Sequence, residues 1–217
     1  MLEVRGLSKK YGRNWVLRNV NLQLGKGRIY GFVGTNGCGK SVLFKTICGF
    51  VKADEGEVLY DGLQIGKDVD FIPSLGVLIE KPVFIEEYDH FQNLKYLASI
   101  RNIIDDQAIR DVIESVGLDM NNRNKVKKYS LGMRQRLGIA QAIMEKPDVL
   151  ILDEPFNGLD KDGRSRITKI IENYVSDNRI VMITSHIDRD IDQLADVVFE
   201  IENCNARCVE KQEKLLM

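Results

Sequence analysis

Ile29-Tyr30-Gly31-Phe32-Val33, followed directly by Gly34-Thr35-Asn36-Gly37-Cys38-Gly39-Lys40-Ser41, is the stretch that decides the fold. The run from Ile29 to Val33 is typical of a buried strand, and the residues after it have the spacing G-x-x-x-x-G-K-[ST]. Leu43, Phe44 and Ile47 then recur at helical spacing. A strand, a glycine-rich loop and a helix in this order predict a phosphate-binding loop.

The loop suits phosphate because glycines let backbone N–H groups curl around the oxygens, while the helix N-terminus adds partial positive charge. Lys40 is expected to reach the β- and γ-phosphates, and Ser41 to place its hydroxyl on Mg²⁺. A plain glycine-rich turn is the alternative, and the flanking strand and helix disfavour it. Kinases, GTPases and helicases share this motif. The predicted nucleotide-binding residues here are Gly34, Thr35, Asn36, Gly37, Cys38, Gly39, Lys40, Ser41 and Val42.

A second group of candidate residues follows the apolar run Val149 to Leu152, which is typical of a strand covered on both faces. Asp153 stands at the carboxyl end of this strand, where open α/β sheets bind ligands, and we expect it to hold Mg²⁺ through water. Glu154 can orient and deprotonate a water that attacks the γ-phosphate. Alternatively, Asp153-Glu154-Pro155 only ends a strand, but the phosphate loop upstream favours the catalytic interpretation.

Strands and helices alternate along most of the chain, which predicts an α/β fold. Between Pro82 and Pro147 helical spacing dominates, so we expect one domain, 1–217, with a core of 1–81 and 148–217 and a helical insert of 82–147. The predicted strands are Val20–Leu24, Ile29–Val33, Glu57–Tyr60, Leu75–Ile79, Val149–Leu152, Ile180–Thr184 and Val197–Ile201, and the predicted helices cover Leu43–Ile47, Phe91–Ala98, Ile109–Val116, Leu131–Met144 and Ile167–Tyr174.

Composition narrows the classes of function. The 217 residues contain 31 Lys plus Arg and 32 Asp plus Glu, for a formal net charge of -1. This balance gives the chain no overall excess of positive charge that would attract nucleic acid, so we do not expect nucleic acid as a partner. No apolar run approaches the roughly 18–20 residues that span a bilayer. Met1 to Arg5 is typical of a strand and has no signal-peptide core. We expect a cytoplasmic protein whose membrane role, if any, comes through a partner.

Several motifs occur in a fixed order along the chain. After the phosphate loop come Tyr129-Ser130-Leu131-Gly132-Met133-Arg134-Gln135-Arg136, Ile151-Leu152-Asp153-Glu154-Pro155, Asn157-Gly158-Leu159-Asp160 and Thr184-Ser185-His186. In this combination the chain resembles the ATP-binding cassette (ABC) family over essentially its whole length. The resemblance implies a P-loop NTPase core with a mostly parallel sheet, an N-terminal antiparallel β subdomain and an inserted α-helical subdomain. It also implies ATP hydrolysis coupled to transport.

The same resemblance implies roles for matching residues. Tyr11 matches the aromatic residue that stacks on adenine, and a tyrosine at a strand end is its alternative. Ser130 and Gly132 match the signature that contacts the γ-phosphate of ATP on an opposite subunit, and Ser130 also suits a helix N-cap. Asp160 matches the loop that crosses the dimer interface, again with an N-cap as alternative. His186 matches the switch histidine at the γ-phosphate.

Partners follow from these roles. Since each ATP needs the phosphate loop of one subunit and the signature of another, the resemblance implies a homo- or heterodimer of ATP-binding subunits with ATP and Mg²⁺ between them. Work on a substrate implies transmembrane permease subunits on separate chains. The chain is therefore expected at the inner face of the cell membrane as a peripheral protein.

Two positions depart from the usual pattern of the family. Glu80 stands where the family has Gln, and a carboxylate there could meet Mg²⁺ or the attacking water while adding negative charge beside the phosphates. Leu131 stands where many relatives have Gly, and a larger side chain should restrict the signature backbone and slow turnover. Both features are similar to the exporters that give self-protection against lantibiotics. We therefore expect export of a peptide antibiotic or another hydrophobic compound.

The segment from Pro82 to about Tyr96 should form the groove for a helix of the permease, with Phe84, Tyr88 and Phe91 as apolar contacts, or else these rings fill the insert's own core. Two other classes of function compete with the transporter. A soluble ABC protein acting on ribosomes or nucleic acid is disfavoured because such relatives usually carry two cassettes or an added arm. A phosphate-loop kinase or GTPase would lack Ser130-Leu131-Gly132.

Overall fold

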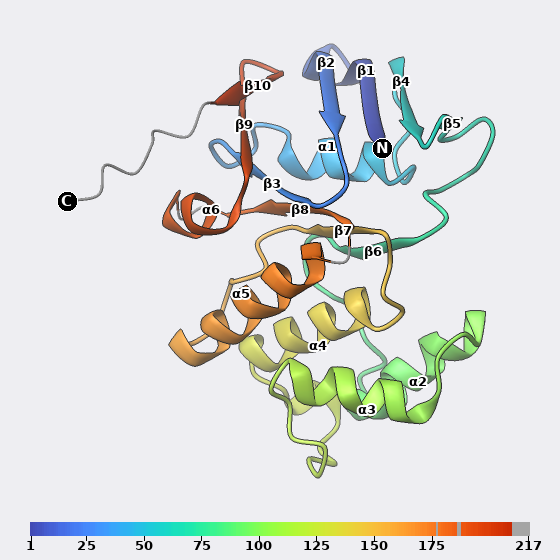
Figure 1. Cartoon of the computed structure of the whole chain (residues 1–217), viewed down its shortest axis with the longest axis vertical. Coiled ribbons are helices and arrows are strands. Elements are labelled where there is room, and N and C mark those ends of the chain that lie inside the picture. The colour runs from blue at the N-terminus through green and yellow to red at the C-terminus, as the bar shows by residue number, and fades with distance from the viewer. Residues whose placement is uncertain (177, 186–187, 210–217) are drawn as a thin grey trace.

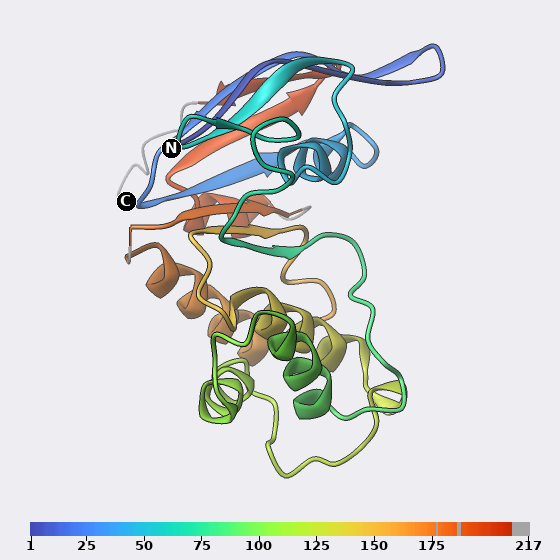
Figure 2. The ribbon, with the colours of Figure 1, turned by 90° about the vertical axis from the view of Figure 1, so that its right-hand side faces the viewer.

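The computed structural model describes residues 1–176, 178–185 and 188–209. Its elements are stacked in layers (Figure 1). A small antiparallel sheet lies at one end, a larger and mostly parallel sheet crosses the middle, and a group of helices covers the other face of that sheet. The side view shows the same order of layers (Figure 2).

The antiparallel sheet has the strand order β2-β1-β4-β5. Its first two strands form a long hairpin that turns at residues 12–13, where Gly12 adopts a left-handed φ of 61°. The hairpin places Tyr11 at the end of its first strand. The strands are β1 (Leu2–Tyr11), β2 (Asn14–Leu24), β4 (Glu55–Tyr60) and β5 (Leu63–Gln64).

The larger sheet has the order β10-β9-β3-β8-β7-β6, with parallel pairing from β9 to β6 and an antiparallel β10 at one edge. The carboxyl ends of its parallel strands therefore meet at one edge, where this fold binds ligands. Its strands are β3 (Arg28–Val33), β6 (Leu75–Leu78), β7 (Val149–Leu152), β8 (Ile180–Thr184), β9 (Val197–Glu202) and β10 (Asn205–Val209).

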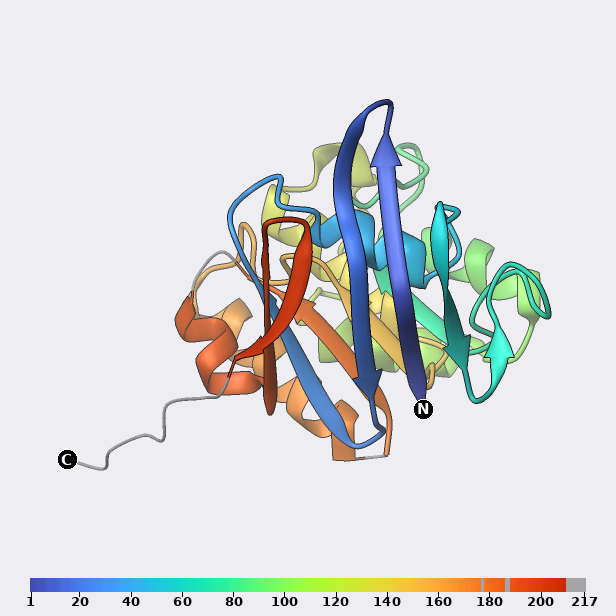
Figure 3. The same ribbon diagram turned by 90° about the horizontal axis from the view of Figure 1, so that it is seen from above.

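Helix α1 lies between the two sheets, and the other helices lie outside this sandwich (Figures 1 and 3). Asp89 begins α2 with a capping box in which Gln92 is the reciprocal partner, a local signal that fixes where the helix starts. The helices are α1 (Lys40–Ile47), α2 (His90–Arg101), α3 (Asp106–Ser115), the 3-10 helix η1 (Val126–Lys128), α4 (Leu131–Ile143), α5 (Lys161–Ser176) and α6 (Asp188–Leu194).

Alternation along the central strands divides the interior into two cores. Val149 and Ile151 face the core under the antiparallel sheet, where Phe32 of β3 meets Phe44 of α1 with ring centroids 5.1 Å apart. Leu150, Leu152 and their neighbours face the helical core instead. All four residues of β7 are fully buried, which confirms the predicted strand with two covered faces.

The predicted fold class is confirmed, including the antiparallel N-terminal sheet and the helical insert. Each predicted strand and helix is present, with ends that differ by a few residues. The sequence interpretation missed β5, β10 and α6, and it stopped β1 at Arg5 although the strand continues to Tyr11. Within the described part of the chain, none of the helices combines the length and apolar character needed to cross a bilayer.

Candidate nucleotide-binding site

The glycine-rich loop joins β3 to α1 at the carboxyl edge of the larger sheet. Gly34 has a φ of 144°, and a Cβ there would stand 2.5 Å from the carbonyl oxygen of Ile201. Gly39, the N-cap of α1, has a φ of 113°. Side chains at these two positions would meet both backbone strain and a close neighbour, so the loop needs glycine for its shape.

Lys40 folds back into this loop. Its side chain is 7% exposed, and Nζ donates to the carbonyl oxygens of Gly34 at 2.7 Å and Thr35 at 3.2 Å. The ammonium thus lies inside the curl of backbone where phosphate oxygens are expected. A phosphate can accept the same hydrogens, and its negative charge adds an ion-pair attraction to the ammonium that a neutral carbonyl oxygen does not supply.

A chain of hydrogen bonds connects α1, β7 and β8 at the same edge. The Ser41 hydroxyl donates to Asp153 Oδ2 at 2.7 Å, and the Thr184 hydroxyl donates to Asp153 Oδ1 at 2.6 Å. Both hydroxyls are therefore held on one carboxylate that is 8% exposed. These are hard oxygen donors, the ligand type that Mg²⁺ prefers, so the residues fit the expected metal. Thr184 was not singled out from the sequence, although it ends a predicted strand.

Glu154 is placed by its backbone. Its N–H donates to Thr184 Oγ1 at 2.8 Å, and its carbonyl oxygen accepts from Gln135 Nε2 of α4 at 2.9 Å. The residue has a φ of 53°, a strained value for a non-glycine residue that neighbouring contacts must maintain. Gln135 is a second positioning residue that sequence reasoning missed, although it lies within the quoted signature motif.

An open cavity of about 350 Å³ brings these groups together. Tyr11 lies at this cavity with half of its surface exposed, and the Lys9 ammonium lies 5.4 Å from the centroid of its ring. An exposed ring of this kind is suited to stacking on a flat ligand. The walls contain an apolar part from Val16 as well as the polar loop and the two carboxylates. The lining residues are Tyr11, Val16, Asn36, Gly37, Gly39, Lys40, Ser41, Val42, Asp153 and Glu154.

Glu80 occupies a position equivalent to that of Glu154. Each stands two residues beyond its strand, the strands pair Leu78 with Leu152, and Glu80 has a similar left-handed φ of 62°. Its carboxylate, however, accepts from Lys45 Nζ at 2.5 Å and is 62% exposed. Lys45 lies one turn after Ser41 on α1. The structure thus directs Glu80 toward α1, and its role at Mg²⁺ stays a prediction.

The signature residues lie at the start of α4. Ser130 Oγ accepts from the backbone N–H of Met133 at 3.2 Å, which confirms the N-cap. A Cβ on Gly132 would stand 2.7 Å from the Gly158 carbonyl oxygen, so the signature packs tightly on the next motif. Leu131 covers Gly158 and stays 55% exposed. In the described part of the chain, Ser130 and Gly132 do not line the cavity at the phosphate loop.

Asp160 has the capping role that was its alternative. Its Oδ1 accepts from the Gly163 N–H at 2.8 Å at the start of α5 and from Arg136 Nη2 at 2.9 Å. The Gly163 bond, and then the Arg136 charge, hold the pKa of this carboxyl below its usual value. Because these contacts lie within one chain, the expected position of Asp160 at a dimer interface stays a prediction. His186 lies outside the described residues.

A second cavity, of about 220 Å³, lies between the end of β6 and α4. It is lined by Lys45, Phe50, Val77, Leu78, Ile79, Lys81, Pro82, Val83, Gly138 and Gln141. Among the three rings expected at a permease groove, Phe84 is buried in the helical core, and Phe91 packs against that core beneath the Arg110 guanidinium. Tyr88 is 38% exposed. For Phe84 the core-filling alternative therefore holds.

Sequence comparison places the chain among known proteins. Residues 17–157 match the family model described as ABC transporter. The chain is 42% identical over 211 residues to the uncharacterized ABC transporter ATP-binding protein YybJ of Bacillus subtilis (strain 168), covering 97% of each chain. It is 35% identical over 198 residues to the lantibiotic transport ATP-binding protein SrtF of Streptococcus pyogenes, covering 91% of this chain and 85% of that one.

The architecture also matches solved structures. The dimeric structure of MJ0796, a bacterial ABC transporter cassette, superposes with a TM-score of 0.87, covering 98% of this chain and 99% of that one. At 20% sequence identity, this likeness supports the fold alone.

Proposed function

Because this chain belongs to the ABC transporter family as an ATP-binding subunit, we propose that it hydrolyses MgATP to drive export of a peptide antibiotic through a permease on separate chains. The observation that carries the proposal is the joined site at the sheet edge. Lys40 lies inside the phosphate loop, and Ser41 and Thr184 are both held on Asp153. One apolar wall and one exposed tyrosine complete a cavity suited to a nucleotide.

The residues divide the work by their chemistry. Tyr11 would stack on the base, and the backbone N–H groups of residues 34–42 with Lys40 would bind the phosphates. Ser41 and Asp153 would hold Mg²⁺, which supplies charge neutralisation at the phosphates. Glu154 would accept a proton from the attacking water, since its backbone is held from two sides beside the cavity. His186 is proposed to contact the γ-phosphate.

A second ATP-binding subunit completes the proposed site. Ser130 and Gly132 stand at a helix N-terminus, where backbone N–H groups and the helix dipole attract anions. Since these residues do not line the cavity of their own chain among the described residues, we propose that they bind the ATP of a partner, with Asp160 near the contact. The MJ0796 cassette, which shares this fold, is dimeric, and we propose a comparable pairing for this chain.

The permease is proposed to dock at the cavity between β6 and α4. Val83 at its rim is 89% exposed, and Phe50 is 51% exposed, which gives a partner helix apolar surface to cover. Docking there would hold the chain at the inner face of the membrane. The substrate class is proposed from the lantibiotic transport protein that resembles it.

Co-expression with any polytopic membrane proteins that neighbouring genes encode tests this function. We expect the chain to co-purify with them from membranes and to raise the tolerance of a sensitive bacterium to a lantibiotic. Lys40→Ala should still co-purify but give no tolerance, because docking does not use the phosphate loop. Retention on ribosomes instead of membranes, or equal tolerance with Lys40→Ala, would contradict the proposal.

A further inference from the structure

The segment proposed to meet the permease forms backbone hydrogen bonds with η1, the short helix before the signature. Residues 82–89, here called the docking segment, run from the second cavity into α2. The Val126 N–H donates to the Tyr88 carbonyl oxygen at 2.9 Å, and the Lys127 N–H donates to the Glu86 carbonyl oxygen at 3.2 Å. Both donors belong to η1, which ends directly before the signature. The two segments therefore lie side by side.

Ion pairs along the rim follow the same path. The Arg134 guanidinium of α4 donates to both Glu86 carboxylate oxygens at 2.8 and 2.9 Å. Lys125 and Lys127 each donate to Glu87. The carboxylates of these pairs are half exposed, so water and salt weaken them and each contributes little. A rigid link between the segments needs a contact that water does not reach.

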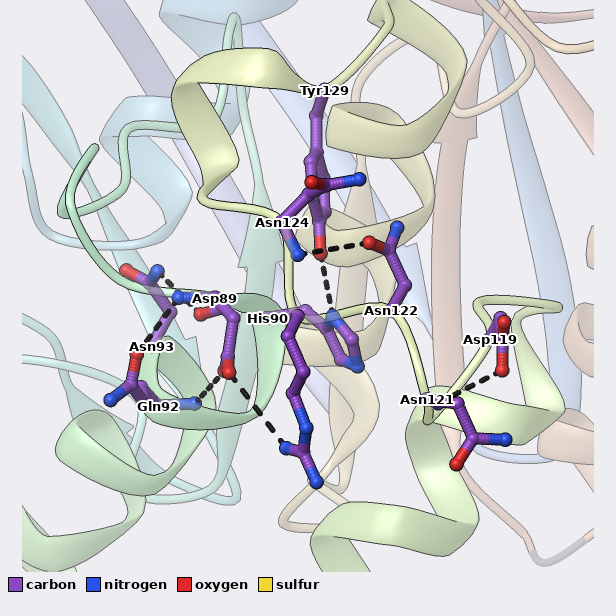
Figure 4. Close-up of polar contacts among 10 residues, drawn as sticks. Asp89, His90, Gln92, Asn93, Asp119, Asn121, Asn122, Asn124 and Tyr129 are labelled. Carbon is purple, nitrogen blue, oxygen red and sulfur yellow. Dashed lines mark hydrogen bonds and ion pairs between the residues drawn. The ribbon is translucent and has the colours of Figure 1, made fainter.

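That contact is a buried pair formed by His90 and Tyr129. His90 Nδ1 lies 2.5 Å from Tyr129 Oη, and the two residues are only 1% and 7% exposed. Figure 4 shows the tyrosine reaching from the signature toward the histidine at the start of α2. His90 Nε2 is buried and has no hydrogen-bond partner among the described residues. The bond to Tyr129 is thus the polar anchor of this ring in the described structure.

The bond to His90 lies next to Ser130 in the chain. Tyr129 directly precedes Ser130, and its own N–H is held by the Val126 carbonyl oxygen at 2.9 Å. With the backbone fixed on one side and the hydroxyl on the other, Tyr129 has little freedom to turn. Ser130 then caps α4 through Met133. The contacts of His90 and Tyr129 therefore connect α2 and the docking segment to the residue that precedes Ser130.

We propose that His90 is a positioning residue for the signature, holding the Tyr129 hydroxyl so that Ser130 meets the ATP of a partner chain in register with the docking segment. This inference rests on the proposed function, because it assumes that Ser130 contacts that ATP. It assigns the two residues no contact with nucleotide. Their loss should therefore affect pairing of two chains and leave nucleotide binding to one chain unchanged.

The test compares two tyrosines in a Glu154→Gln background. Tyr129→Phe removes the hydroxyl and keeps the ring. Tyr174→Phe is the matched control, because its hydroxyl is equally buried and donates to the Pro147 carbonyl oxygen at 2.9 Å away from the signature. Light scattering gives the ATP concentration for half-maximal dimerisation, and fluorescent ATP binding to dilute protein reports on the single chain. The melting temperature controls for stability.

We expect Tyr129→Phe to raise the ATP concentration for half-maximal dimerisation about three- to tenfold, the effect of one buried hydrogen bond, while Tyr174→Phe leaves it unchanged. Both should lower the melting temperature similarly. His90→Met should repeat the defect and His90→Gln should partly restore dimerisation, and this second pair tests the inference even if Tyr129→Phe does not fold. The double variant His90→Met with Tyr129→Phe should be no worse than either single one.

The outcomes separate the inference from the function beneath it. If the Glu154→Gln chain stays monomeric with ATP, the proposed dimer fails and the positioning role falls with it. If that chain dimerises but Tyr129→Phe behaves like Tyr174→Phe, or His90→Met behaves like His90→Gln, the role of His90 is overturned and the proposed function stands.

Discussion

The phosphate-loop region and the signature region are both proposed to bind the phosphates of ATP, yet they are built differently. At the loop, Lys40, Asp153 and Thr184 are buried and Ser41 is partly buried. Ser41 and Thr184 bind Asp153, and Lys40 binds the carbonyl oxygen of Gly34. At the signature, Ser130 and Leu131 stand exposed at the start of one helix, directly after Tyr129, whose hydroxyl meets His90. The buried groups at the loop are already held in place by hydrogen bonds within one chain. The exposed helix N-terminus at the signature is instead accessible to a ligand bound on another molecule.

This contrast separates two kinds of substitution. Changes in the buried network should affect nucleotide binding or chemistry in a single chain, because the groups that contact the ligand belong to that chain. Changes near the signature should affect the response to ATP only when two chains meet. A variant in one region that shows the effect expected of the other region would contradict the comparison.

The largest effect is expected at Glu154. Replacing it by Gln keeps size and backbone contacts but removes the proton acceptor, so turnover should fall by about 10²–10⁴-fold, the usual contribution of a general base. ATP binding should be kept, and the dimer should accumulate because hydrolysis no longer separates it. Phosphate release and light scattering measure the two results. Normal turnover in Glu154→Gln would assign the base to another residue.

Lys40→Ala should have the next largest effect. It removes a full positive charge from the place where the phosphates bind, and we expect about 100-fold weaker ATP binding. Titration of the single chain with fluorescent ATP measures this. Lys95→Ala is the matched control, since Lys95 pairs with Asp106 on the surface and its loss should leave ATP affinity unchanged. Equal affinity in both variants would remove Lys40 from the site.

A smaller effect than that of Lys40→Ala is expected at Glu80, which lies beyond the end of β6 and pairs with Lys45 of α1. Glu80→Gln removes the carboxylate, and we expect the Mg²⁺ concentration for half-maximal turnover to rise about threefold, because one charge near the metal is lost. Lys45→Gln breaks the same ion pair but keeps the carboxylate, so it should not raise that concentration. Stability should change by less than about 1 kcal/mol in both, as for exposed pairs. If both variants match the original protein, Glu80 has no role at the metal.

Sequence reasoning succeeded where a short motif fixes its own geometry. The spacing of Gly34, Gly39 and Lys40 requires one loop shape, and the continuous apolar run of β7 requires burial on both faces, so both were predictable. Ser130 and Asp160 could be predicted as helix caps because a cap needs only the few residues that follow it. Features that depend on a short stretch of sequence could therefore be predicted from it.

What could not be predicted depends on contacts between distant segments. Thr184 and Gln135 support the site across 31 and 19 residues. Both lie within motifs that the sequence displays, but the motifs do not reveal that their side chains meet Asp153 and Glu154. Lys45 meets Glu80 because α1 packs beside the end of β6, which redirects a carboxylate that the sequence alone placed at the metal. The bond between His90 and Tyr129 spans 39 residues and joins segments that were predicted separately. Strands β5 and β10 were missed because each is short and pairs at a sheet edge.

The smallest effect concerns the pH dependence of stability, and it follows from the burial of His90. Burial lowers the pKa of this histidine, with the Arg123 charge acting in the same direction and Asp89 and Asp119 acting against it, while the Tyr129 hydroxyl faces the ring. In the unfolded chain the ring takes up a proton below about pH 6.5, where the folded chain does not yet bind one.

The contribution of His90 to the free energy of unfolding should therefore be complete above about pH 6.5. As the pH falls below this value, the free energy of unfolding should decrease by at most about 1.4 kcal/mol per pH unit because of this group. His90→Gln cannot take up that proton, so its stability should decrease less between pH 7.5 and 5.5. Urea unfolding at both pH values measures the difference, and any contribution from His186 cancels because both proteins contain it. Equal decreases would mean that His90 is already charged or hydrated in the folded chain. The bond between His90 and Tyr129 would then be accessible to water, which contradicts the buried contact proposed to connect the docking segment with the signature.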